Sequence, residues 1–501
     1  MTVCCNTVIS VVSYIIVKSV ILAIDIGTTS SKGLAVLGDG NVVALAQRYY
    51  PTQYPQSGFA EQDSAEIMRA VVEIIGEVIN KTGNDYELKG ISFSAAMHSI
   101  MAVDAEGSPL SPLIIWADTR STEQSKRLRE EQRAQHLYEV TGTPVHPMSP
   151  LCKLMWWREN DAALFERTYK FISIKEFVLH ALTGEFVIDY SIASATGLFD
   201  NENKQWYGPA LTLAGITTEK LSKPVPVYYS IREKQALLLK TGVPASVPLI
   251  AGASDGCLAQ LGSGAMGDHD LSITLGTSGA VRMASAVRKT DPKGRIFNYL
   301  LDDTTYICGG ATNNGTALLS WYANKFNVSA SVRLNEFVKE VATVAAGCDG
   351  LIALPFLLGE RAPMYNPDAR GVFFGVSINH THLHFQRALL EGICFELKSI
   401  INSVEETLGP CRRVFVSGGF THSEEWVQML TDISGHALVL ADDKDASSLG
   451  AAMVGFKAVG EEMVLSHSST RVFEPDVTLR DLYGHNFMLF EELYRVLEKM
   501  F

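Results

Sequence analysis

The sequence predicts an α/β protein made of two similar domains with a ligand-binding cleft between them. Residues 21–32 join an apolar, β-branched half to a carboxylate, a glycine, four hydroxyl residues and a lysine. Residues 271–279 repeat the order of apolar strand, glycine, hydroxyls and glycine. The glycines that follow the two strands, Gly27 and Gly276, are 249 residues apart in a chain of 501 residues. Because a chain of this length exceeds one hydrophobic core, the repeat indicates a duplicated domain.

The turn after the first strand has the groups that bind phosphate. Gly27 allows a close backbone approach, the hydroxyls of Thr28 and Thr29 are donors, and Lys32 adds a positive charge. Asp25 stands at the strand end, where a carboxylate can hold a hydrated Mg²⁺ together with substrate phosphates. An ordinary β-turn explains either stretch alone, but two copies favour a nucleotide bound between two domains.

Composition narrows the class of protein. The chain is 47% hydrophobic and 19% charged, as is usual for a globular enzyme, and its net charge of −13 argues against a nucleic-acid partner. The eight cysteines are scattered without a C-x-x-C pair, which favours buried free thiols over disulfides or a zinc site and indicates a cytoplasmic protein.

The first residues differ from the rest. Residues 8–16 are mostly apolar, but no basic segment precedes them and no cleavage site follows. A membrane span would have to include Asp25, so we expect no membrane segment. We expect residues 1–18 to be an extension outside the fold, and one hypothesis is that translation starts at Val17.

Hydrophobic periodicity predicts the order of the elements. In the first half we expect a hairpin turn at 38–41, a helix over 61–80 capped by Asp63 or Ser64, a strand at 89–94, and helices near 121–137, 150–158 and 174–182. Further strands are expected at 247–251, 272–275, 305–308, 414–417 and 437–440, and further helices at 315–325, 381–402, 423–433 and 447–459.

Two motifs do not have the context that their usual function requires. Residues 262–267 match G-x-G-x-x-G but precede a strand instead of following one, so we interpret them as a hinge between domains rather than a dinucleotide site. His380, His382 and His384 do not share one helix face and have no carboxylate nearby in the sequence, so a structural role is favoured over metal binding.

The motifs taken together resemble the FGGY carbohydrate kinases, which share the actin-like (ribonuclease H-like) ATPase fold. The resemblance runs from about Val20 to the C-terminus. It implies an N-terminal domain over 19–264, carrying the sugar and one phosphate site, and a C-terminal domain over 265–501, carrying the other phosphate site and adenosine. It is carried by residues 25–30, 116–120, 252–256, 274–279, 359–363, 369–371 and 417–420.

Within the family, the chain is most similar to gluconate kinases. The stretches 94–99, 141–154 and 189–198 carry this likeness. It implies ATP-dependent phosphorylation of D-gluconate to 6-phospho-D-gluconate. One alternative is the same reaction on another sugar such as xylulose, and another is a non-catalytic ATP-binding switch on the same fold.

The resemblance also implies roles for single residues. It implies that Asp255 is the general base that accepts the proton of the attacking hydroxyl. An ordinary turn aspartate in Ser-Asp-Gly is the alternative, but the position of Asp255 between a strand and the expected hinge favours catalysis. The resemblance further implies that Asp25 holds Mg²⁺, that Thr28, Thr29 and Lys32 contact the transferring phosphate, and that Gly276 and Thr277 bind the remaining phosphates. The adenosine pocket comprises Gly315, Gly418, Gly419 and Ser423.

On the sugar side, the family pattern points to Met97, His98, Trp116, Asp118 and Arg120. A sugar acid also needs a cation for its carboxylate, and the candidates are Arg120, Lys153 and Lys175. We further expect the two domains to close over their ligands, and the resemblance implies a homodimer.

Overall fold

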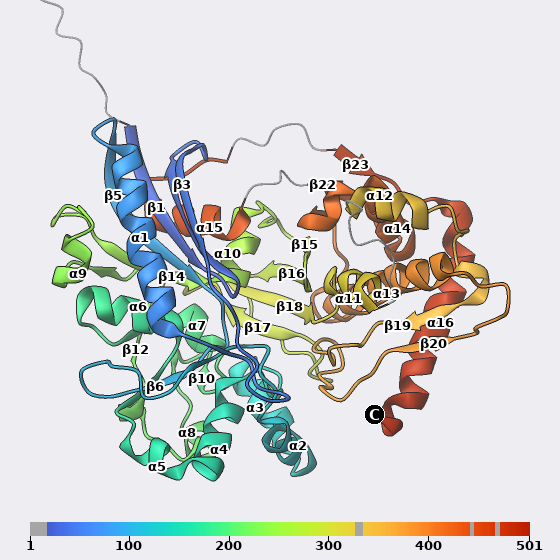
Figure 1. Ribbon diagram of the computed structural model, residues 1–501, viewed down its shortest axis with the longest axis horizontal. Helices are drawn as coiled ribbons and strands as arrows, with labels where there is room; N and C mark the ends of the chain where they lie inside the picture. Colours follow the sequence, from blue (N-terminus) through green and yellow to red (C-terminus); the bar gives the residue numbers. More distant parts are fainter. Residues whose placement is uncertain (1–17, 326–333, 441–444, 466–470) are drawn as a thin grey trace, which may run out of the picture.

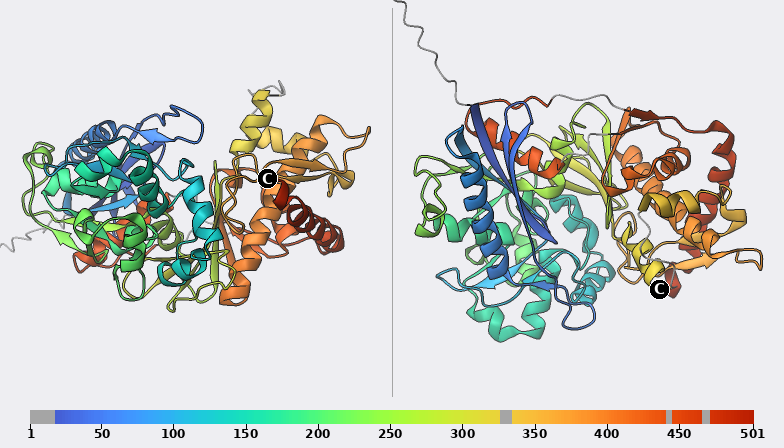
Figure 2. Two further views of the ribbon diagram at one scale, coloured as in Figure 1. Left: turned by 90° about the horizontal axis from the view of Figure 1, so that it is seen from below. Right: turned by 45° about the horizontal axis from the view of Figure 1, so that its top comes forward.

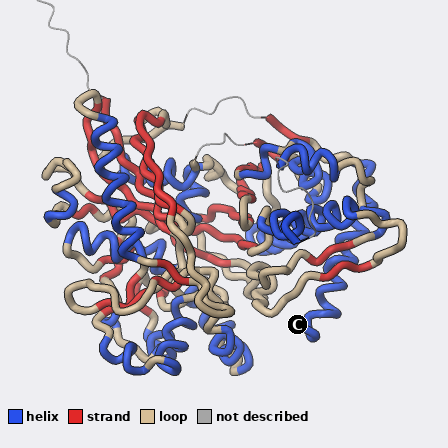
Figure 3. Tube along the Cα trace, in the orientation of Figure 1, coloured by secondary structure: helices blue, strands red, loops and turns tan. Residues whose placement is uncertain are grey.

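The structure is a computed structural model that describes residues 18–325, 334–440, 445–465 and 471–501 (Figure 1). The extension expected over residues 1–18 lies outside the described residues except for Lys18, which begins the first strand. Two lobes are built largely from successive parts of the sequence, the first mainly from blue to green and the second mainly from yellow to red (Figure 2). The exception is the orange-red helix over residues 446–458, which lies in the first lobe. In both lobes helices flank a central sheet (Figure 3).

Each lobe is organised around one large sheet. The first has the strand order β13-β14-β5-β1-β2-β3 and the second the order β17-β18-β16-β15-β21-β22-β23. The first comprises β1 (Lys18–Ile26), β2 (Ser30–Leu37), β3 (Val42–Tyr49), β5 (Tyr86–Ala95), β13 (Ser230–Ile231) and β14 (Leu249–Ser254). The second comprises β15 (Asp270–Leu275), β16 (Gly279–Ser285), β17 (Phe297–Leu300), β18 (Tyr306–Thr312), β21 (Arg413–Ser417), β22 (Leu438–Leu440) and β23 (Arg471–Phe473).

The pairing of the strands confirms the predicted duplication. In the first sheet β1 pairs antiparallel with β2 and parallel with β5, while β2 continues antiparallel to β3 and β5 parallel to β14. In the second sheet β15 pairs in the same way with β16 and β21, which continue to β18 and β22. Since parallel strands end at the same edge of a sheet, the loops after β1 and β15 occupy equivalent places in the two copies.

The two faces of β1 pack against different helices because its side chains alternate. Leu22 and Ile24 belong to the core covered by α1 (Ser64–Thr82), whereas Ile21 and Ala23 face α10 (Asp255–Gly262) and α15 (Ala446–Ala458). Helix α15 comes from the second half of the sequence but lies beside β1 in the first lobe (Figure 1). The two halves are therefore interlocked rather than merely linked.

Glycines make that interlock possible. A Cβ on Gly262 would overlap the carbonyl oxygen of Ala446, and a Cβ on Gly450 would overlap that of Leu258, so α10 and α15 cross with their backbones in contact. The first glycine of the G-x-G-x-x-G match is thus a helix-packing residue that ends α10. The hinge expected there stays a prediction.

The second core surrounds a long buried helix, α13 (His382–Leu408), and is closed by α14 (Glu424–Ser434) and α16 (Arg480–Leu497). Smaller elements fill the base of the first lobe and the rim of the second. They are β4 (Glu61–Gln62), β6 (Met101–Val103), β7 (Leu113–Ile114), α4 (Pro150–Asn160), α5 (Ala162–Arg167), β8 (Lys170–Ile172), α6 (Ile174–Thr183), β9 (Val187–Asp189), α7 (Tyr190–Ser194), β10 (Phe199–Asp200), β11 (Gln205–Trp206), α8 (Gly208–Ala214), β12 (Lys223–Val225), α9 (Ala236–Leu239), α11 (Ala317–Lys325), α12 (Leu334–Val341), β19 (Ile352–Leu354) and β20 (Val372–Phe374).

Most predicted elements are present, with two corrections. The helix expected over 121–137 is two helices, α2 (Thr122–Glu130) and α3 (Ala134–Thr141), because Gln132 adopts a positive φ of 56° between them. The helix expected over 61–80 begins only at Ser64, where the Asp63 side chain accepts from two backbone N–H groups, and residues 61–62 form β4 instead.

The histidine cluster needs a third correction. A carboxylate does lie near it, since Asp349 approaches to 3.3 Å from the Nε2 of His384 although it is distant in sequence. The other ring nitrogen of His384 meets Thr381 at the start of α13, which agrees with a structural role. Among the described residues, no helix is both long and apolar enough to cross a membrane.

Candidate active site

A cavity of about 930 Å³ lies between the two lobes. The first lobe contributes the loop after β1 and the residues that follow β5, β7 and β14, and the second lobe contributes the β15–β16 hairpin and the segment after β19. Its lining includes Thr28, Thr29, Met97, His98, Trp116, His146, Asp255, Thr277, Arg282, Tyr299, Asn313, Arg361 and Tyr365. Both halves of the duplication thus face one shared space.

Asp255 is the carboxylate that lines this cavity, and its side chain is half-buried. It opens α10 directly after β14, and its Oδ1 accepts from the N–H of Gly256 at 2.7 Å. Burial, followed by the negative charge of Asp25, raises the pKa of Asp255 to about 6, and the nearby Arg282 opposes that rise. The group is therefore ionised at neutral pH and has a pKa close to that of an effective general base.

Side chains of the first lobe hold the loop after β1. The Trp116 Nε1 donates to Thr28 Oγ1 at 2.9 Å, and the Gln62 amide donates to the carbonyl of Thr28. The Tyr50 hydroxyl donates to the carbonyl of Gly27 at 2.6 Å. Because these contacts occupy groups on several sides of the turn, Thr28 and Thr29 are held at the cavity wall.

Asp25 and Lys32 lie on the strands before and after that loop and are not among the residues that line the cavity. Asp25 accepts from the hydroxyls of Ser94 at 2.6 Å and Ser447 at 2.8 Å. Lys32 pairs with Asp445 at 2.6 Å. Burial first, and then the charge of Asp445, raises the pKa of Asp25. Nothing in the sequence indicated Asp445, which caps α15 and is brought here by the crossing of that helix into the first lobe.

These carboxylates fit a hydrated divalent cation. The charge of Asp445 raises the pKa of Asp25, and that of Asp25 raises the pKa of Asp255, so a cation between the lobes would relieve their repulsion. Asp25 belongs to no preformed set of three converging ligands within the described residues. A Mg²⁺ held partly by water and substrate phosphates is compatible with that arrangement.

The second loop is shaped by backbone contacts. The N–H of Gly276 donates to the carbonyl of Ser278 at 2.9 Å, and the N–H of Thr316 donates to the carbonyl of Gly276 at 2.8 Å. A Cβ on Gly315 would meet the carbonyl oxygens of Gly276 and Thr277, whereas a Cβ on Gly276 would meet nothing within 4 Å. Gly315 thus allows close packing, and the surface of Gly276 is open for a ligand.

The predicted adenosine residues lie beside this loop. Gly418 has a φ of 100°, and a Cβ there would stand 2.6 Å from the carbonyl oxygen of Leu275, so only glycine fits. Gly419 has open space around it. The hydroxyl of Ser423 caps α14 through the N–H of Trp426 and also contacts Glu425. Its role toward a purine stays a prediction.

Three predicted sugar residues line the cavity, namely Met97, His98 and Trp116. His98 has a positive φ of 67° and its Nδ1 lies 2.8 Å from the carbonyl of Ala195. Burial, together with the charges of Lys153 and Arg361, lowers the pKa of His98 to about 3. The imidazole is therefore neutral, so its Nδ1 donates to that carbonyl and its Nε2 is an acceptor.

Asp118 and Arg120 form a buried ion pair that does not line the cavity. The Asp118 Oδ2 accepts from the N–H of Ala60 at 2.7 Å and from Arg120 at 2.8 Å, and Arg120 also binds Glu61. The guanidinium of Arg120 lies 3.7 Å from the ring centre of Phe59. This ion pair supports Phe59 in the cavity wall. Because Arg120 already binds two carboxylates, it is not free to bind the carboxylate of a substrate.

The two lysine candidates for the substrate carboxylate are engaged in the same way. The Lys153 ammonium donates to the carbonyls of His98 and Ile115, each at 2.8 Å, and burial lowers its pKa to about 7. The Lys175 ammonium pairs with Asp189 at 2.6 Å and donates to the carbonyl of Ala253. Both hold the backbone on which the site is built.

The residues that sequence reasoning missed are Arg282, Tyr299, His146, Arg361 and Tyr365, all of which line the cavity. His146 and Arg361 fall within stretches that carry the family resemblance. The sequence therefore indicated these motifs, but it did not predict that these two side chains line the cavity. Several of these side chains have buried polar atoms without a partner in the described residues. Such groups cost about 1–3 kcal/mol each unless a ligand satisfies them.

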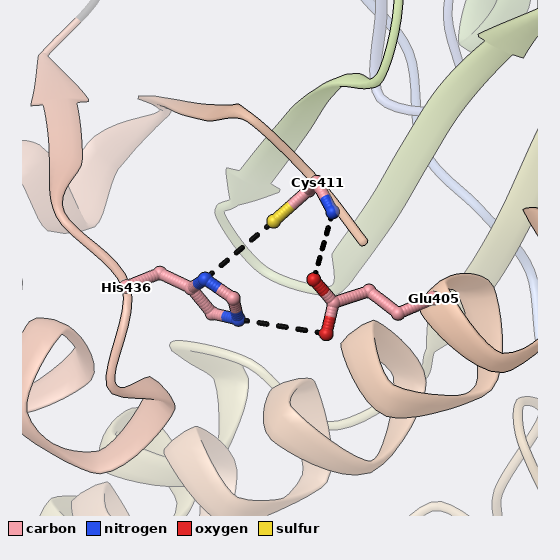
Figure 4. Close-up of side chains that lie close together, drawn as sticks. All are labelled: Glu405, Cys411 and His436. Carbon is pink, nitrogen blue, oxygen red and sulfur yellow. Dashed lines mark hydrogen bonds and ion pairs between the residues drawn. The ribbon is translucent and has the colours of Figure 1, made fainter. Parts of the chain in front are cut away.

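A second cluster lies away from the cavity. Glu405, Cys411 and His436 approach one another closely enough to share a metal ion (Figure 4). Glu405 accepts from the N–H of Cys411 at 2.9 Å and lies 3.7 Å from His436, whose other ring nitrogen is 3.5 Å from the Cys411 sulfur. Since Cys411 precedes β21 and Ser417 ends it, this cluster is at the opposite sheet edge from the phosphate loops.

Comparison with known proteins defines the class. The N-terminal domain model of the FGGY family of carbohydrate kinases matches residues 20–262, and the C-terminal domain model matches residues 271–459. The chain therefore belongs to the FGGY family of carbohydrate kinases. The predicted two-domain, actin-like ATPase fold is confirmed by this membership and by similar solved structures.

The relatives that match the chain include gluconokinases and xylulose kinases. A gluconokinase of Bacillus subtilis is 39% identical over 453 residues, covering 88% of each chain. A xylulose kinase of Staphylococcus xylosus is 28% identical over 446 residues, covering 88% of this chain and 91% of its own. Crystal structures of a gluconate kinase and of a ligand-bound xylulose kinase, both from Lactobacillus acidophilus, each have a TM-score of 0.90 and 30% identity, with 96% of this chain and 98% of theirs covered.

Proposed function

We propose that the protein transfers the γ-phosphoryl group of ATP to D-gluconate and forms 6-phospho-D-gluconate. The observation that carries the proposal is the position of Asp255, a half-buried carboxylate at the cavity wall with a pKa of about 6. There it can accept the proton of the sugar hydroxyl that attacks the phosphorus, and the hydroxyl oxygen becomes more nucleophilic as that proton leaves.

The two loops supply the positioning that phosphoryl transfer requires. Donors on the first loop, Thr28 and Thr29, face the same cavity as Thr277 on the second loop. Gly418 and Gly419 leave backbone free of side-chain bulk beside the second loop, which suits an adenine ring. Opposed donors of this kind hold the phosphate chain and stabilise the charge that spreads over the transferred group.

A divalent cation belongs to this proposal. Asp25, with Asp445 behind it, would hold Mg²⁺ through water, and the ion would neutralise charge on the phosphates. Lys32 forms an ion pair with Asp445, so its positive charge acts mainly on the carboxylates of Asp445 and Asp25. Metal removal by a chelator should abolish turnover, and added Mg²⁺ should restore it.

The choice of gluconate rests on the gluconokinase relatives, since their identity to the chain exceeds that of the xylulose kinases. Xylulose is the second candidate, because a xylulose kinase structure is as similar to this one as a gluconate kinase structure is. A non-catalytic ATP switch would not need Asp255 in the cavity.

The test is an ADP-release assay with Mg²⁺ and ATP over gluconate, xylulose, ribulose and glycerol. Turnover on gluconate that is lost in Asp255→Asn supports both the substrate and the base. Turnover on xylulose alone would make xylulose the substrate in place of gluconate. ATP binding without sugar-dependent turnover would favour a non-catalytic ATP-binding switch. The homodimer and the closure of the lobes stay predictions, to be checked by light scattering and by small-angle scattering with and without ligands.

A further inference from the structure

Unpartnered polar groups gather at one part of the cavity. Within the described residues, the Nε of Arg361, the Nε2 of His146 and the hydroxyl of Tyr365 are all buried without a hydrogen-bond partner, and all three residues line the cavity. His146 and Tyr365 are 3% and 5% exposed. Buried donors that the protein leaves unsatisfied around a cavity mark a place where a ligand supplies the acceptor.

The environment of His146 fixes it as a donor. Its Nδ1 accepts from the N–H of Met148 at 3.2 Å, so in the neutral ring the proton is on Nε2. Burial lowers the pKa of His146 well below its usual value, and the positive charges of Arg129 and Arg361 lower it further. The ring is neutral, and its unpartnered nitrogen carries a hydrogen.

Arg361 brings a full positive charge to the same place. Its Nη2 donates to the carbonyl of Thr312 at 3.0 Å, and its guanidinium lies 4.7 Å from the ring centre of Trp116. These contacts fix the plane of the guanidinium and leave Nε without a partner in the described residues. Arg361 begins the turn that ends at Tyr365, whose N–H donates to the carbonyl of Arg361.

The other cations near the cavity are engaged or serve the reacting end. Arg120, Lys153 and Lys175 bind carboxylates or carbonyls as described above. Arg282 is the arginine whose charge most lowers the pKa of Asp255, so it belongs with the general base. Among the described cations that line the cavity, Arg361 is the one with a buried donor that has no partner.

We propose that Arg361, His146 and Tyr365 form an anion subsite that binds the carboxylate of a sugar acid. From this subsite the carbon chain of the substrate would extend to the hydroxyl that Asp255 deprotonates. One charged and two neutral donors suit a carboxylate, which accepts several hydrogen bonds, better than a hydroxymethyl group. The subsite rests on the proposed function and names the groups that would make it specific for an acid.

The test compares gluconate with D-glucitol, which has a hydroxymethyl group in place of the carboxylate, and with xylulose. The measured quantity is the ratio of kcat/KM for gluconate to that for the best uncharged substrate. Tyr365→Phe removes only the unpartnered hydroxyl, and Arg361→Gln removes the charge. We expect the ratio to fall about 10-fold in the first variant and about 100-fold in the second.

Arg370→Gln is the matched charge control. Arg370 also lies at the cavity but is exposed, and its guanidinium binds the carbonyls of Pro367 and Ala369. Its removal should change the ratio by less than about twofold if specificity depends on local hydrogen bonds rather than on overall charge. Thermal unfolding of each variant shows whether it is folded, and Tyr365→Phe should unfold at or above the wild-type temperature, because it removes a buried hydroxyl without a partner in the described residues and breaks no internal contact.

The outcomes separate the two proposals. If the wild type phosphorylates gluconate and the ratio is unchanged in both Tyr365→Phe and Arg361→Gln, the subsite is wrong and the proposed function stands. Turnover on another sugar acid but not on gluconate overturns the named substrate, and the same ratio measured with that acid still tests the subsite. Turnover on uncharged sugars only, with no sugar-acid binding in calorimetry, overturns both.

Discussion

The loops after β1 and β15 are equivalent in the duplication but are held in different ways. The first is fixed by side chains, with Trp116, Gln62 and Tyr50 all binding its backbone or hydroxyls. The second is fixed by backbone, through Gly276 and the close approach of Gly315. The loop after β1 is thus held by hydrogen bonds from specific side chains, whereas the loop after β15 exposes backbone without side-chain cover.

This difference fits two kinds of ligand. A small polyol is distinguished from its isomers by individual hydrogen bonds, which need side chains fixed on a rigid wall. A nucleotide presents phosphates and a flat base, which backbone N–H groups and glycines can accept without sequence-specific side chains. After duplication, the first lobe carries the general base and most of the side chains expected for the sugar, the second lobe adds Arg361 and Tyr365, and the second loop stays the simpler one.

The largest expected effect comes from Asp255, the carboxylate proposed as the general base. Asp255→Asn should lower kcat by about 10²- to 10⁴-fold, because the amide cannot accept the proton. The variant should also be more stable than the wild type at neutral pH, by an amount on the order of 2 kcal/mol, because burial disfavours the charged form. Initial rates and urea unfolding measure the two effects.

Asp85→Asn is the control, since Asp85 is exposed and should change neither quantity. An Asp255→Asn enzyme with a wild-type rate would remove the catalytic asymmetry between the lobes, whatever its stability.

The pH dependence follows from the same group. With a pKa of about 6 for Asp255, kcat/KM should be constant near neutral pH and fall by about tenfold per unit below 6. Because the folded pKa is raised above the unfolded value, the stability that this group contributes is present below about pH 4 and is lost as the pH rises through 6. Rate profiles and unfolding at pH 5 and 7 test both trends, and Asp255→Asn should abolish the stability trend.

Substitutions at two glycines test the backbone character of the second loop. Gly315→Ala should lower the free energy of unfolding by about 1–3 kcal/mol, since the new methyl group displaces the carbonyls of Gly276 and Thr277. A Cβ at position 276 meets nothing within 4 Å, so the Gly276→Ala variant should unfold at the wild-type temperature. Its KM for ATP should rise about tenfold. Equal thermal stability of the two variants would contradict the packing role of Gly315.

A smaller effect is expected from the side-chain contact of the first loop. Thr28→Val keeps the shape but leaves the buried N–H of Trp116 without its acceptor, which should cost about 1 kcal/mol and raise KM for the sugar a few-fold. A double-mutant cycle with Trp116→Phe measures the coupling between the two residues. Additive effects would mean that this hydrogen bond does not hold the loop.

The smallest effect on turnover should come from the cluster at the far sheet edge. Burial by itself would raise the pKa of Glu405, but the hydrogen bonds from His436 and from the N–H of Cys411 hold it at about 2. The stability from this lowered pKa is present above the unfolded value and is lost as the pH falls from about 4.5 to 2. His436→Ala should therefore lower the free energy of unfolding at acid pH and leave kcat unchanged. Unfolding measured at about pH 3.5 tests the first effect.

The sequence was most informative where local chemistry sets local structure. The apolar run before Asp25, the glycine after it and the repeat at residues 271–279 predicted two equivalent strand–loop units, which the matching strand orders confirm. The break at Gln132 was missed because a positive φ in a non-glycine residue has no reliable pattern in sequence. The approach of Asp349 to His384 was missed because 35 residues separate them.

Among the site residues, the sequence identified those whose backbone position places them at a strand end. Thr28, Met97, Trp116 and Asp255 all follow strands that end at the cavity, and all line it. It could not distinguish a cation that faces the cavity from one that lies behind its wall. Lys153 and Arg361 are both basic residues in family motifs, yet the first binds carbonyls and the second keeps a free Nε.

The sequence by itself determined the α/β class, the duplication, the family and the carboxylate proposed as the base, because each depends on residues adjacent in the chain. Only the tertiary structure decided which side chains share the cavity, since that depends on contacts between distant segments. The crossing of α15 brings Asp445 to Lys32, and the packing of the second lobe brings Arg361 over Trp116. Such contacts are set by helix packing and burial across the whole chain, which no local pattern records.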